Sequence, residues 1–356
     1  MHRRASIVIA VLLLGFGPVA EAQWPWTKPR PRATATPVPQ RVVPQKKAAP
    51  TPPPTPTPVP TPMVALPNYD METSTRLQIF LDNNNFGPGK IDGEMGEFFR
   101  KALLAYKAAN GLPMTGAVDP VMIEEVPEVF TNYTIRPEDE KLVGNTPSGP
   151  SQQAKQKWLP YNSYLEFVAE RFHASQDFIR KLNPGRNLDA LQIGEVVKVP
   201  NVRPFEIETL KEGFHEALPE FAARKVFIDT RERFLIVREG EKIICEFPIT
   251  PGSGSLPAPK GTWKVLGVAT MPWFRHDEGV LNRGVRTDNF YNLPPGPNNP
   301  VGVLWMGLNK PGIGMHGTNN PETIGRAASH GCIRLANWDA ARIKNFVGKG
   351  NVVEIF

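Results

Sequence analysis

Two short segments near the C-terminus contain the residues best suited to nucleophilic chemistry. The run Ser-His-Gly-Cys-Ile-Arg contains His330 and Cys332, and His316 begins the earlier run His-Gly-Thr. A cysteine attacks as its thiolate, so a nearby imidazole that accepts the proton or lowers the thiol pKa makes it reactive. Gly317 and Gly331 leave room for substrate and for backbone N–H groups that face an oxyanion. In an extended segment His330 and Cys332 project to the same side.

Three other interpretations stay open from the residue types alone. Cys332 could form a disulfide with Cys245, the second of two cysteines, if the chain is exported. The two histidines and Cys332 could bind zinc, which accepts nitrogen and thiolate ligands. All three could also be ordinary buried residues. Cys245 lies inside a predicted strand, which favours a packed small residue over a disulfide partner.

The same segments resemble a known family. Met-His-Gly-Thr at 315–318 and Ser-His-Gly-Cys-Ile-Arg-Leu at 329–335 are similar to the signature of the L,D-transpeptidase (YkuD-type) family. The resemblance extends over residues 223–356 and includes Pro-Lys-Gly-Thr-Trp at 259–263 and Asn-Pro-Val-Gly at 299–302. Its spacing makes nucleophilic catalysis the favoured interpretation.

The resemblance implies a role for each residue of the signature. Cys332 would be the nucleophile and His316 its base, and the Gly317 carbonyl would orient the imidazole. His330 and nearby backbone amides would form the acyl-transfer pocket. The other polar residues would bind or orient the substrate, or else form an internal ion pair and local caps: Arg334, Ser329 and Thr318.

Residues 271–299 are rich in loop-forming residues and aromatics. Long loops in compact domains are commonly functional or disordered. By resemblance this segment is a substrate-covering loop in which Trp273 and Tyr291 contact the substrate. A flap packed on the core is the alternative.

The reaction that the resemblance implies is acyl transfer between peptidoglycan stem peptides. Cys332 would attack a stem tetrapeptide between an L-centre and D-Ala, form a thioester, release D-Ala and pass the acyl group to an amine of a second stem, giving a 3→3 cross-link. No metal or organic cofactor is required, and carbapenem-type inhibitors would acylate the same thiol. Transfer to water or to a protein lysine would make an L,D-carboxypeptidase, an endopeptidase or an enzyme that attaches proteins to the wall.

A hypothesis of a different class is a non-catalytic wall-binding protein with an inactive C-terminal domain. It would keep the contacts with peptidoglycan glycan and lose the chemistry. The intact Cys332, His316 and His330 argue against it. No feature of the sequence specifies an oligomeric state.

The elements that must position these residues begin near Lys225, where apolar residues alternate with a period of two. We therefore expect a mainly β, sandwich-like catalytic domain over residues 223–356, with the nucleophile near a strand end. One helix is expected after the motif, capped by Asn337 and ended by Gly348. A last strand is expected at residues 352–356.

Residues 68–128 predict a small helical domain. Ser74 is expected to cap a first helix, and a second helix runs from Glu97 to Asn110-Gly111. The order of Leu-Gln, a glycine-rich turn, Ile-Asp-Gly, a helix and Gly-Leu resembles the three-helix peptidoglycan-binding domain.

Residues 129–205 predict an α+β unit in the order strand, helix, helix, strand. Ala-Glu-Arg-Phe, Leu-Asn-Pro and Ile-Gly-Glu-Val-Val resemble a LysM glycan-binding unit, although the usual Gly-Asp-Thr-Leu turn is missing. A structural spacer is the alternative interpretation. Residues 206–222 are expected to connect this unit to the catalytic domain.

The N-terminus predicts export. Residues 1–22 combine a short basic start, an apolar run and Ala20-Glu21-Ala22, which is typical of a signal peptide cleaved after Ala22. An uncleaved anchor is the alternative interpretation. Location in the periplasm or cell wall is therefore expected. Residues 23–67 form a proline-rich basic linker with six Lys or Arg residues and no acid, which equals the formal net charge of +6. Because the charge lies in a linker, nucleic-acid binding is not supported.

Overall fold

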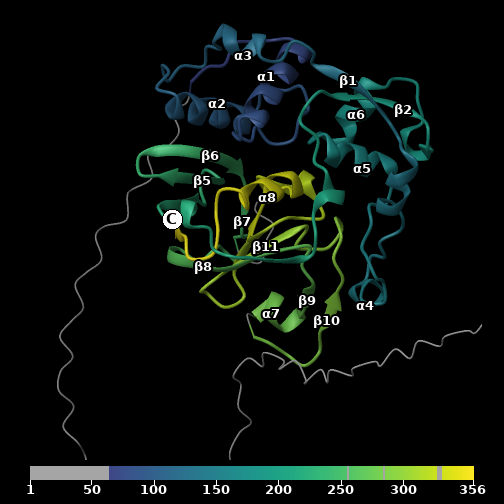
Figure 1. Ribbon diagram of the computed structural model, residues 1–356, viewed down its shortest axis with the longest axis vertical. Helices are drawn as coiled ribbons and strands as arrows, with labels where there is room; N and C mark the ends of the chain where they lie inside the picture. Colours follow the sequence, from purple (N-terminus) through teal and green to yellow (C-terminus); the bar gives the residue numbers. More distant parts are fainter. Residues whose placement is uncertain (1–63, 255, 284, 327–330) are drawn as a thin grey trace, which may run out of the picture. The chain divides into compact units, whose positions relative to one another are not determined.

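The computed structural model describes residues 64–356, with gaps at 255, 284 and 327–330 (Figure 1). The expected signal peptide and most of the linker lie outside the described residues. Within the described part of the chain, no helix combines the length and apolar character needed to cross a membrane. The described residues form two helix-rich segments followed by a segment built on a large sheet.

The first segment contains three helices: α1 (Met71–Asn83), α2 (Glu97–Ala109) and α3 (Pro120–Glu124). The predicted cap at Ser74 is wrong, because the Asp70 carboxylate accepts the Thr73 N–H at 2.7 Å and starts α1 earlier. On the core side, the ring of Phe80 meets Tyr106 edge-on at 5.0 Å between centroids. The segment is thus a small helical domain with an aromatic core.

The second segment has the predicted order of strand, helix, helix and strand. Its main elements are β1 (Phe130–Thr134), α5 (Tyr164–Arg171), α6 (Gln176–Leu182) and β2 (Val196–Pro200), with shorter helices η1 (Pro137–Leu142), α4 (Pro150–Gln153) and η2 (Leu188–Ala190). The strands pair antiparallel, from Phe130 opposite Pro200 to Thr134 opposite Val196. Ser163 and Ser175 cap the two longer helices. The segment shares one hydrophobic core with the first.

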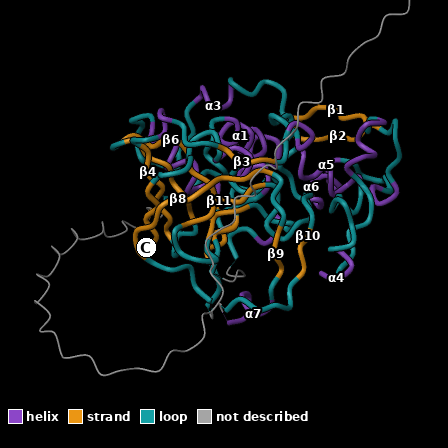
Figure 2. The backbone as a smooth tube through the Cα atoms, turned by 60° about the horizontal axis from the view of Figure 1, so that its bottom comes forward, coloured by secondary structure: helices purple, strands orange, loops and turns teal. Residues whose placement is uncertain are grey.

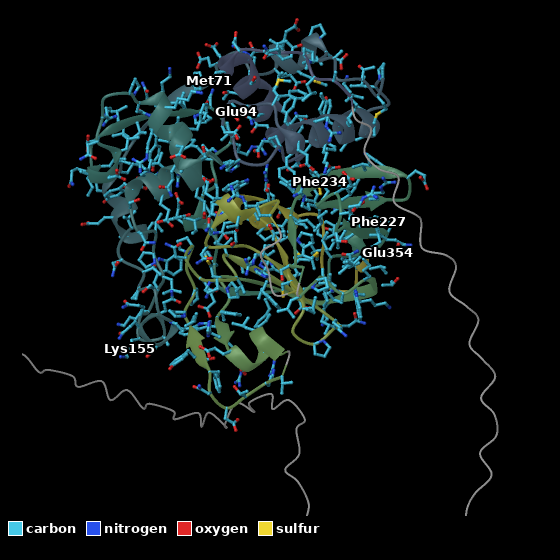
Figure 3. The ribbon with its side chains drawn as sticks, turned by 180° about the vertical axis from the view of Figure 1, so that it is seen from behind. Met71, Glu94, Lys155, Phe227, Phe234 and Glu354 are labelled. Atoms are coloured by element: carbon cyan, nitrogen blue, oxygen red, sulfur yellow. The ribbon has the colours of Figure 1, made fainter. Side chains whose placement is uncertain are left out.

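The third segment is organised around a ten-stranded sheet. Its path runs β6 (Lys242–Pro248), β5 (Phe234–Glu239), β4 (Arg224–Asp229), β14 (Val352–Ile355), β8 (Gly261–Thr270), β11 (Leu304–Leu308), β12 (Gly314–His316), β13 (Ile333–Arg334) and β7 (Thr250–Pro251). The pairs β4–β14 and β12–β13 are parallel, and the others on this path are antiparallel. Figure 3 shows Phe227, Phe234 and Glu354, which come from β4, β5 and β14.

The long strand β8 joins two parts of this sheet. Its first half pairs with β14, and its second half pairs with β11 and with β3 (Gly213–His215). Part of the expected connector, residues 206–222, therefore belongs to the sheet; the short helices η3 (Ile207–Thr209) and η4 (Pro219–Phe221) flank β3. Side chains from both parts enter one apolar core.

Helix α8 (Asn337–Ile343) lies between the sheet and helix α5 (Figure 1). Its Trp338 belongs to the core shared by the first two segments, whereas Ala340 and Ile343 belong to the core of the sheet. The helix follows β13 directly and so begins next to the signature. Its N-cap is Ala336, so the predicted cap at Asn337 is wrong and the Asn337 side chain has another role.

The expectation of one long loop over residues 271–299 is also wrong. The segment, called the flap below, contains β9 (Phe274–His276), α7 (Glu278–Arg283) and β10 (Tyr291–Leu293), and the two strands pair only with each other in the described chain (Figure 2). Asp277 organises the turn, because its carboxylate accepts N–H bonds from Gly279 at 3.0 Å and Thr287 at 2.9 Å.

Candidate active site

The parallel pair β12–β13 brings the two parts of the signature together. Met315 lies opposite Ile333 and His316 lies opposite Arg334. Met315 and Ile333 are fully buried in the core of the sheet. Because side chains alternate along a strand, His316 and Arg334 lie on the other face. Cys332 directly precedes β13, and its thiol lies close enough to Arg334 for the two groups to affect each other's pKa. The fold therefore brings the two parts of the signature side by side, with His316 on one strand and Cys332 at the beginning of the other segment.

His316 is held in one tautomer. Its Nδ1 lies 2.6 Å from the Gly317 carbonyl oxygen, which only accepts hydrogen bonds, so Nδ1 carries the proton and donates. The ring stacks on Trp305 with 5.4 Å between centroids and 23° between planes. Burial, with a smaller effect from Arg334, lowers the pKa of His316 to about 3. The imidazole is therefore neutral at physiological pH and keeps its lone pair on Nε2.

Cys332 is half-buried at the start of β13. Its Sγ lies 3.4 Å from the carbonyl oxygen of Gly312. Burial raises the pKa of the Cys332 thiol, and the backbone of Gly314 and the charge of Arg334 only partly offset this. The resting site therefore pairs a protonated thiol with a neutral imidazole. The preceding Gly331 has φ +95°, a conformation that residues with a Cβ rarely adopt.

The disulfide interpretation is wrong. Cys245 is completely buried in β6 and forms no disulfide within the described structure. Burial raises its thiol pKa well above the usual range, so Cys245 is an inert core residue. The zinc interpretation required His330, which, like Ser329, lies outside the described residues.

Arg334 and Thr318 flank the pair in different ways. Arg334 is half-buried close to Cys332, and burial lowers its guanidinium pKa. Thr318 is buried, and its hydroxyl accepts the Asn320 N–H at 3.1 Å, so it caps local backbone. These positions place a cation beside the thiol and leave Thr318 with a structural contact.

The two aromatic residues predicted to bind substrate lie in the flap. Trp273 is 55% exposed, and its indole N–H donates to Glu212 at 3.2 Å. Tyr291 starts β10 opposite His276. Among the described residues, neither side chain has a recorded hydrogen bond to β12 or β13. Their side chains therefore remain accessible on a segment separate from the catalytic strands.

Asn337 is a site residue that sequence reasoning missed. Its Oδ1 accepts the N–H groups of Val303 and Thr318, each at 3.2 Å. Its Nδ2 donates to Glu170 Oε1 at 2.9 Å and to the Pro297 carbonyl at 3.2 Å. Its place directly after the signature is visible in the sequence, but the pattern there predicts a helix cap and gives no sign of these contacts.

Comparison with known protein families agrees with this geometry. Residues 223–355 match the L,D-transpeptidase catalytic domain, YkuD, and residues 72–125 match a peptidoglycan binding domain. A Bacillus licheniformis protein named as an L,D-transpeptidase, YkuD, is 26% identical over 191 residues, which cover 54% of this chain and 92% of that protein. YkuD of Bacillus subtilis is 44% identical over 71 residues, which cover 19% of this chain and 43% of that protein.

Solved structures with local similarity include the catalytic domain of an Enterococcus faecium L,D-transpeptidase, with 21% identity and a TM-score of 0.31. That match covers 38% of this chain and 98% of the other. L,D-transpeptidase 3 of Mycobacterium tuberculosis, solved with a faropenem-derived adduct, has 19% identity and a TM-score of 0.31; the match covers 46% of this chain and 75% of the other.

The sheet-rich segment is therefore the catalytic domain of a cysteine-dependent acyltransferase. More specifically, residues 223–355 form an L,D-transpeptidase catalytic domain, and residues 72–125 form a peptidoglycan-binding domain. The chain therefore combines an L,D-transpeptidase catalytic domain with a peptidoglycan-binding domain.

Proposed function

We propose that this chain cross-links peptidoglycan stem peptides with Cys332 as nucleophile and His316 as general base. The observation that carries the proposal is the β12–β13 pair. It supports the proposal because His316 lies on the strand next to the segment that carries Cys332, and because the Gly317 carbonyl holds the imidazole with Nδ1 protonated, so that Nε2 is the basic atom.

The first half-reaction acylates the thiol. As Sγ attacks the carbonyl carbon between the L-centre and D-Ala, Nε2 of His316 accepts the thiol proton. The tetrahedral intermediate then collapses, its C–N bond breaks, and the same proton passes to the departing D-Ala amine. The products are D-Ala and a Cys332 thioester.

The second half-reaction regenerates the enzyme. An amine of a second stem attacks the thioester carbonyl and loses a proton through His316 to the departing thiolate. Neither half-reaction needs a preformed ion pair, because the raised thiol pKa and the lowered imidazole pKa favour two neutral groups at rest. Proton transfer thus accompanies attack.

The remaining signature residues have supporting roles in this proposal. Arg334, beside the thiol, attracts a carboxylate of the stem peptide. His330 and Ser329 contribute to the acyl-transfer pocket by family resemblance, together with backbone N–H groups that face the oxyanion. Trp273 and Tyr291 contact the substrate from the flap.

The N-terminal parts deliver the enzyme to its substrate. Residues 72–125 retain the protein on peptidoglycan, and the signal-like residues 1–22 direct export to the periplasm or wall. Residues 129–205 keep the element order of a LysM unit, but helix α5 contributes a buried carboxyl to α8. That contact supports a structural role for this segment.

The direct test incubates the purified protein with tetrapeptide muropeptides and resolves the products by mass. Cross-linked dimers that have lost D-Ala are expected from wild type and Cys245→Ala, and none from Cys332→Ala. Tripeptides without dimers would identify water as the acceptor. Unchanged muropeptides and no thioester on Cys332 would contradict the proposal.

A further inference from the structure

A buried carboxyl from outside the catalytic domain reaches the active-site backbone. Glu170, on α5 in residues 129–205, is 5% exposed. Its Oε1 accepts the Tyr161 hydroxyl at 2.8 Å and Asn337 Nδ2 at 2.9 Å. This contact joins residues 167 positions apart in the sequence. A polar group so deeply buried is costly unless it is fully hydrogen-bonded, so the arrangement is specific.

Asn337 connects the Glu170 carboxyl to the backbone around His316. Its Oδ1 accepts the Thr318 N–H and the Val303 N–H. Thr318 directly follows Gly317, whose carbonyl accepts the His316 Nδ1 proton. The orientation of the peptide that fixes the imidazole therefore depends on where the Asn337 amide lies, and Glu170 holds the other end of that amide.

Two glycines make room for this amide. A Cβ added to Gly302 would lie 2.0 Å from Asn337 Oδ1, and one added to Gly317 would lie 2.3 Å from it. Both distances are far shorter than a van der Waals contact. The amide thus fills a space that only glycine leaves, and small shifts of the amide are transmitted to the backbone.

We infer that Glu170 is a positioning residue for the catalytic histidine, acting through Asn337. Residues 129–205 are then part of the catalytic apparatus and not only a spacer or a glycan-binding unit. The inference rests on the proposed roles of Cys332 and His316. It adds a requirement for a side chain at position 170 that accepts hydrogen bonds.

The carboxyl acts chiefly in its neutral form. Burial, with a smaller contribution from the nearby Glu166, raises the pKa of Glu170 to about 8, although the Asn337 and Tyr161 hydrogen bonds partly oppose this rise. Arg171 is the cation close to Tyr161. A glutamine is therefore a close mimic, since its amide oxygen accepts both hydrogen bonds without a charge.

The same segment offers a matched control. Asp139 is also a fully buried carboxylate, and it also accepts a tyrosine hydroxyl, that of Tyr133 at 2.6 Å. Its other recorded hydrogen bonds come from Arg136, within the same segment, and not from α8. Truncating Asp139 therefore removes a buried tyrosine hydrogen bond, together with an ion pair to Arg136, without touching Asn337.

The experiment measures two quantities for the full chain. Intact-protein mass follows the rate at which a carbapenem acylates it, and the melting temperature reports its stability. Glu170→Ala should acylate about 10- to 100-fold more slowly, because a displaced base loses alignment. Glu170→Gln should stay within about twofold of wild type. Asp139→Ala, with a similar melting loss, should stay within about threefold. Equal rates for Glu170→Ala and Asp139→Ala would overturn the inference.

A second pair of variants decides the matter if Glu170→Ala does not fold. Asn337→Asp keeps the acceptor for the backbone but replaces the donor that faces Glu170, so it should acylate more slowly. Adding Glu170→Gln supplies an amide donor to the new carboxylate and should restore part of the rate. Equal rates for the single and double variants would overturn the inference. A wild-type protein that gains no adduct on Cys332 would instead overturn the proposed function.

Discussion

Two buried polar clusters join the N-terminal segments to α8, and they differ in charge. The ion cluster consists of Asp82 on α1, His173, Asp339 and Arg342. The amide cluster consists of Tyr161, Glu170 and Asn337. Both clusters lie against helix α8. Comparing them therefore separates the effect of buried charges from the effect of a buried, chiefly neutral group of hydrogen bonds.

The ion cluster is held by charge. Asp82 accepts from Arg342 Nη2 at 2.9 Å and lies 2.9 Å from His173 Nδ1. Burial raises the Asp82 pKa, but Arg342 and His173 outweigh it and hold that pKa well below its usual range. The His173 ring also stacks on Trp338 at 5.3 Å. Breaking such a pair leaves a buried charge, so this cluster chiefly fixes the fold.

The amide cluster is held by geometry and contacts the backbone of the site. Its carboxyl is chiefly neutral, and its amide makes four hydrogen bonds, two of them to residues beside His316. The ion cluster has no recorded hydrogen bond to β12 or β13 among the described residues. We therefore expect the ion cluster to control stability and the amide cluster to control catalysis.

The largest effect should come from the residue that the amide cluster serves. His316→Ala removes the general base, which commonly contributes about 10²–10⁴-fold to the rate. The acylation rate of Cys332 by a carbapenem measures the loss and sets the upper limit for any variant of the amide cluster. A Glu170→Ala loss larger than that of His316→Ala would mean that Glu170 acts by another route.

The ion cluster should show the opposite profile. Arg342→Ala leaves the buried Asp82 carboxylate without its arginine partner. This loss should lower the free energy of unfolding by about 3–5 kcal/mol. Urea unfolding measures this loss. The acylation rate per folded molecule should remain within about threefold of wild type, and a hundredfold loss of rate would remove the distinction between the clusters.

The two parts of this picture differ in how far the sequence indicates them. Cys332 and His316 lie in two short runs of fixed spacing, and the resemblance of these runs to a family signature is what singles them out. The amide cluster could not be predicted in this way, because Glu170 and Asn337 meet only through the tertiary fold. A contact between residues so far apart in the sequence leaves no local periodicity or spacing from which it could be predicted. Asn337, at the start of a helix, instead fits the pattern of a helix cap.

The errors in local structure have a similar cause. The flap was predicted as one loop because β9 and β10 are three residues each and give no alternating run. What holds them is the Asp277 carboxylate, which binds backbone across the turn. The helices α1, α2, α5 and α6, with their longer apolar repeats, were predicted from the sequence, whereas the short helices α4 and α7 were not. At α1 the predicted cap, Ser74, lies about one turn after the observed cap, Asp70.

The pH dependence of stability should sharpen the comparison further. Because burial raises the Glu170 pKa from 4.5 to about 8, the folded state binds a proton that the unfolded state has lost. The resulting stabilisation is complete below about pH 4.5 and is lost as the pH rises to about 8, with a slope of about 1.4 kcal/mol per pH unit. The difference in unfolding free energy between wild type and Glu170→Gln should follow this course. A difference that does not vary with pH would contradict a neutral carboxyl.

The smallest predicted effect uses two equivalent caps. Ser163 caps α5, which carries Glu170, and accepts the Glu166 N–H at 3.1 Å; Ser175 caps α6 and accepts the Phe178 N–H at the same distance. Each Ser→Ala change should cost about 1 kcal/mol of unfolding free energy, because a helix N–H loses its acceptor. Fraying at the start of α5 should also loosen Glu170, so Ser163→Ala should slow acylation by about twofold, whereas Ser175→Ala should leave the rate unchanged. Equal rates at equal stability would show that the amide cluster tolerates motion in α5, which would restrict positioning to Asn337 itself.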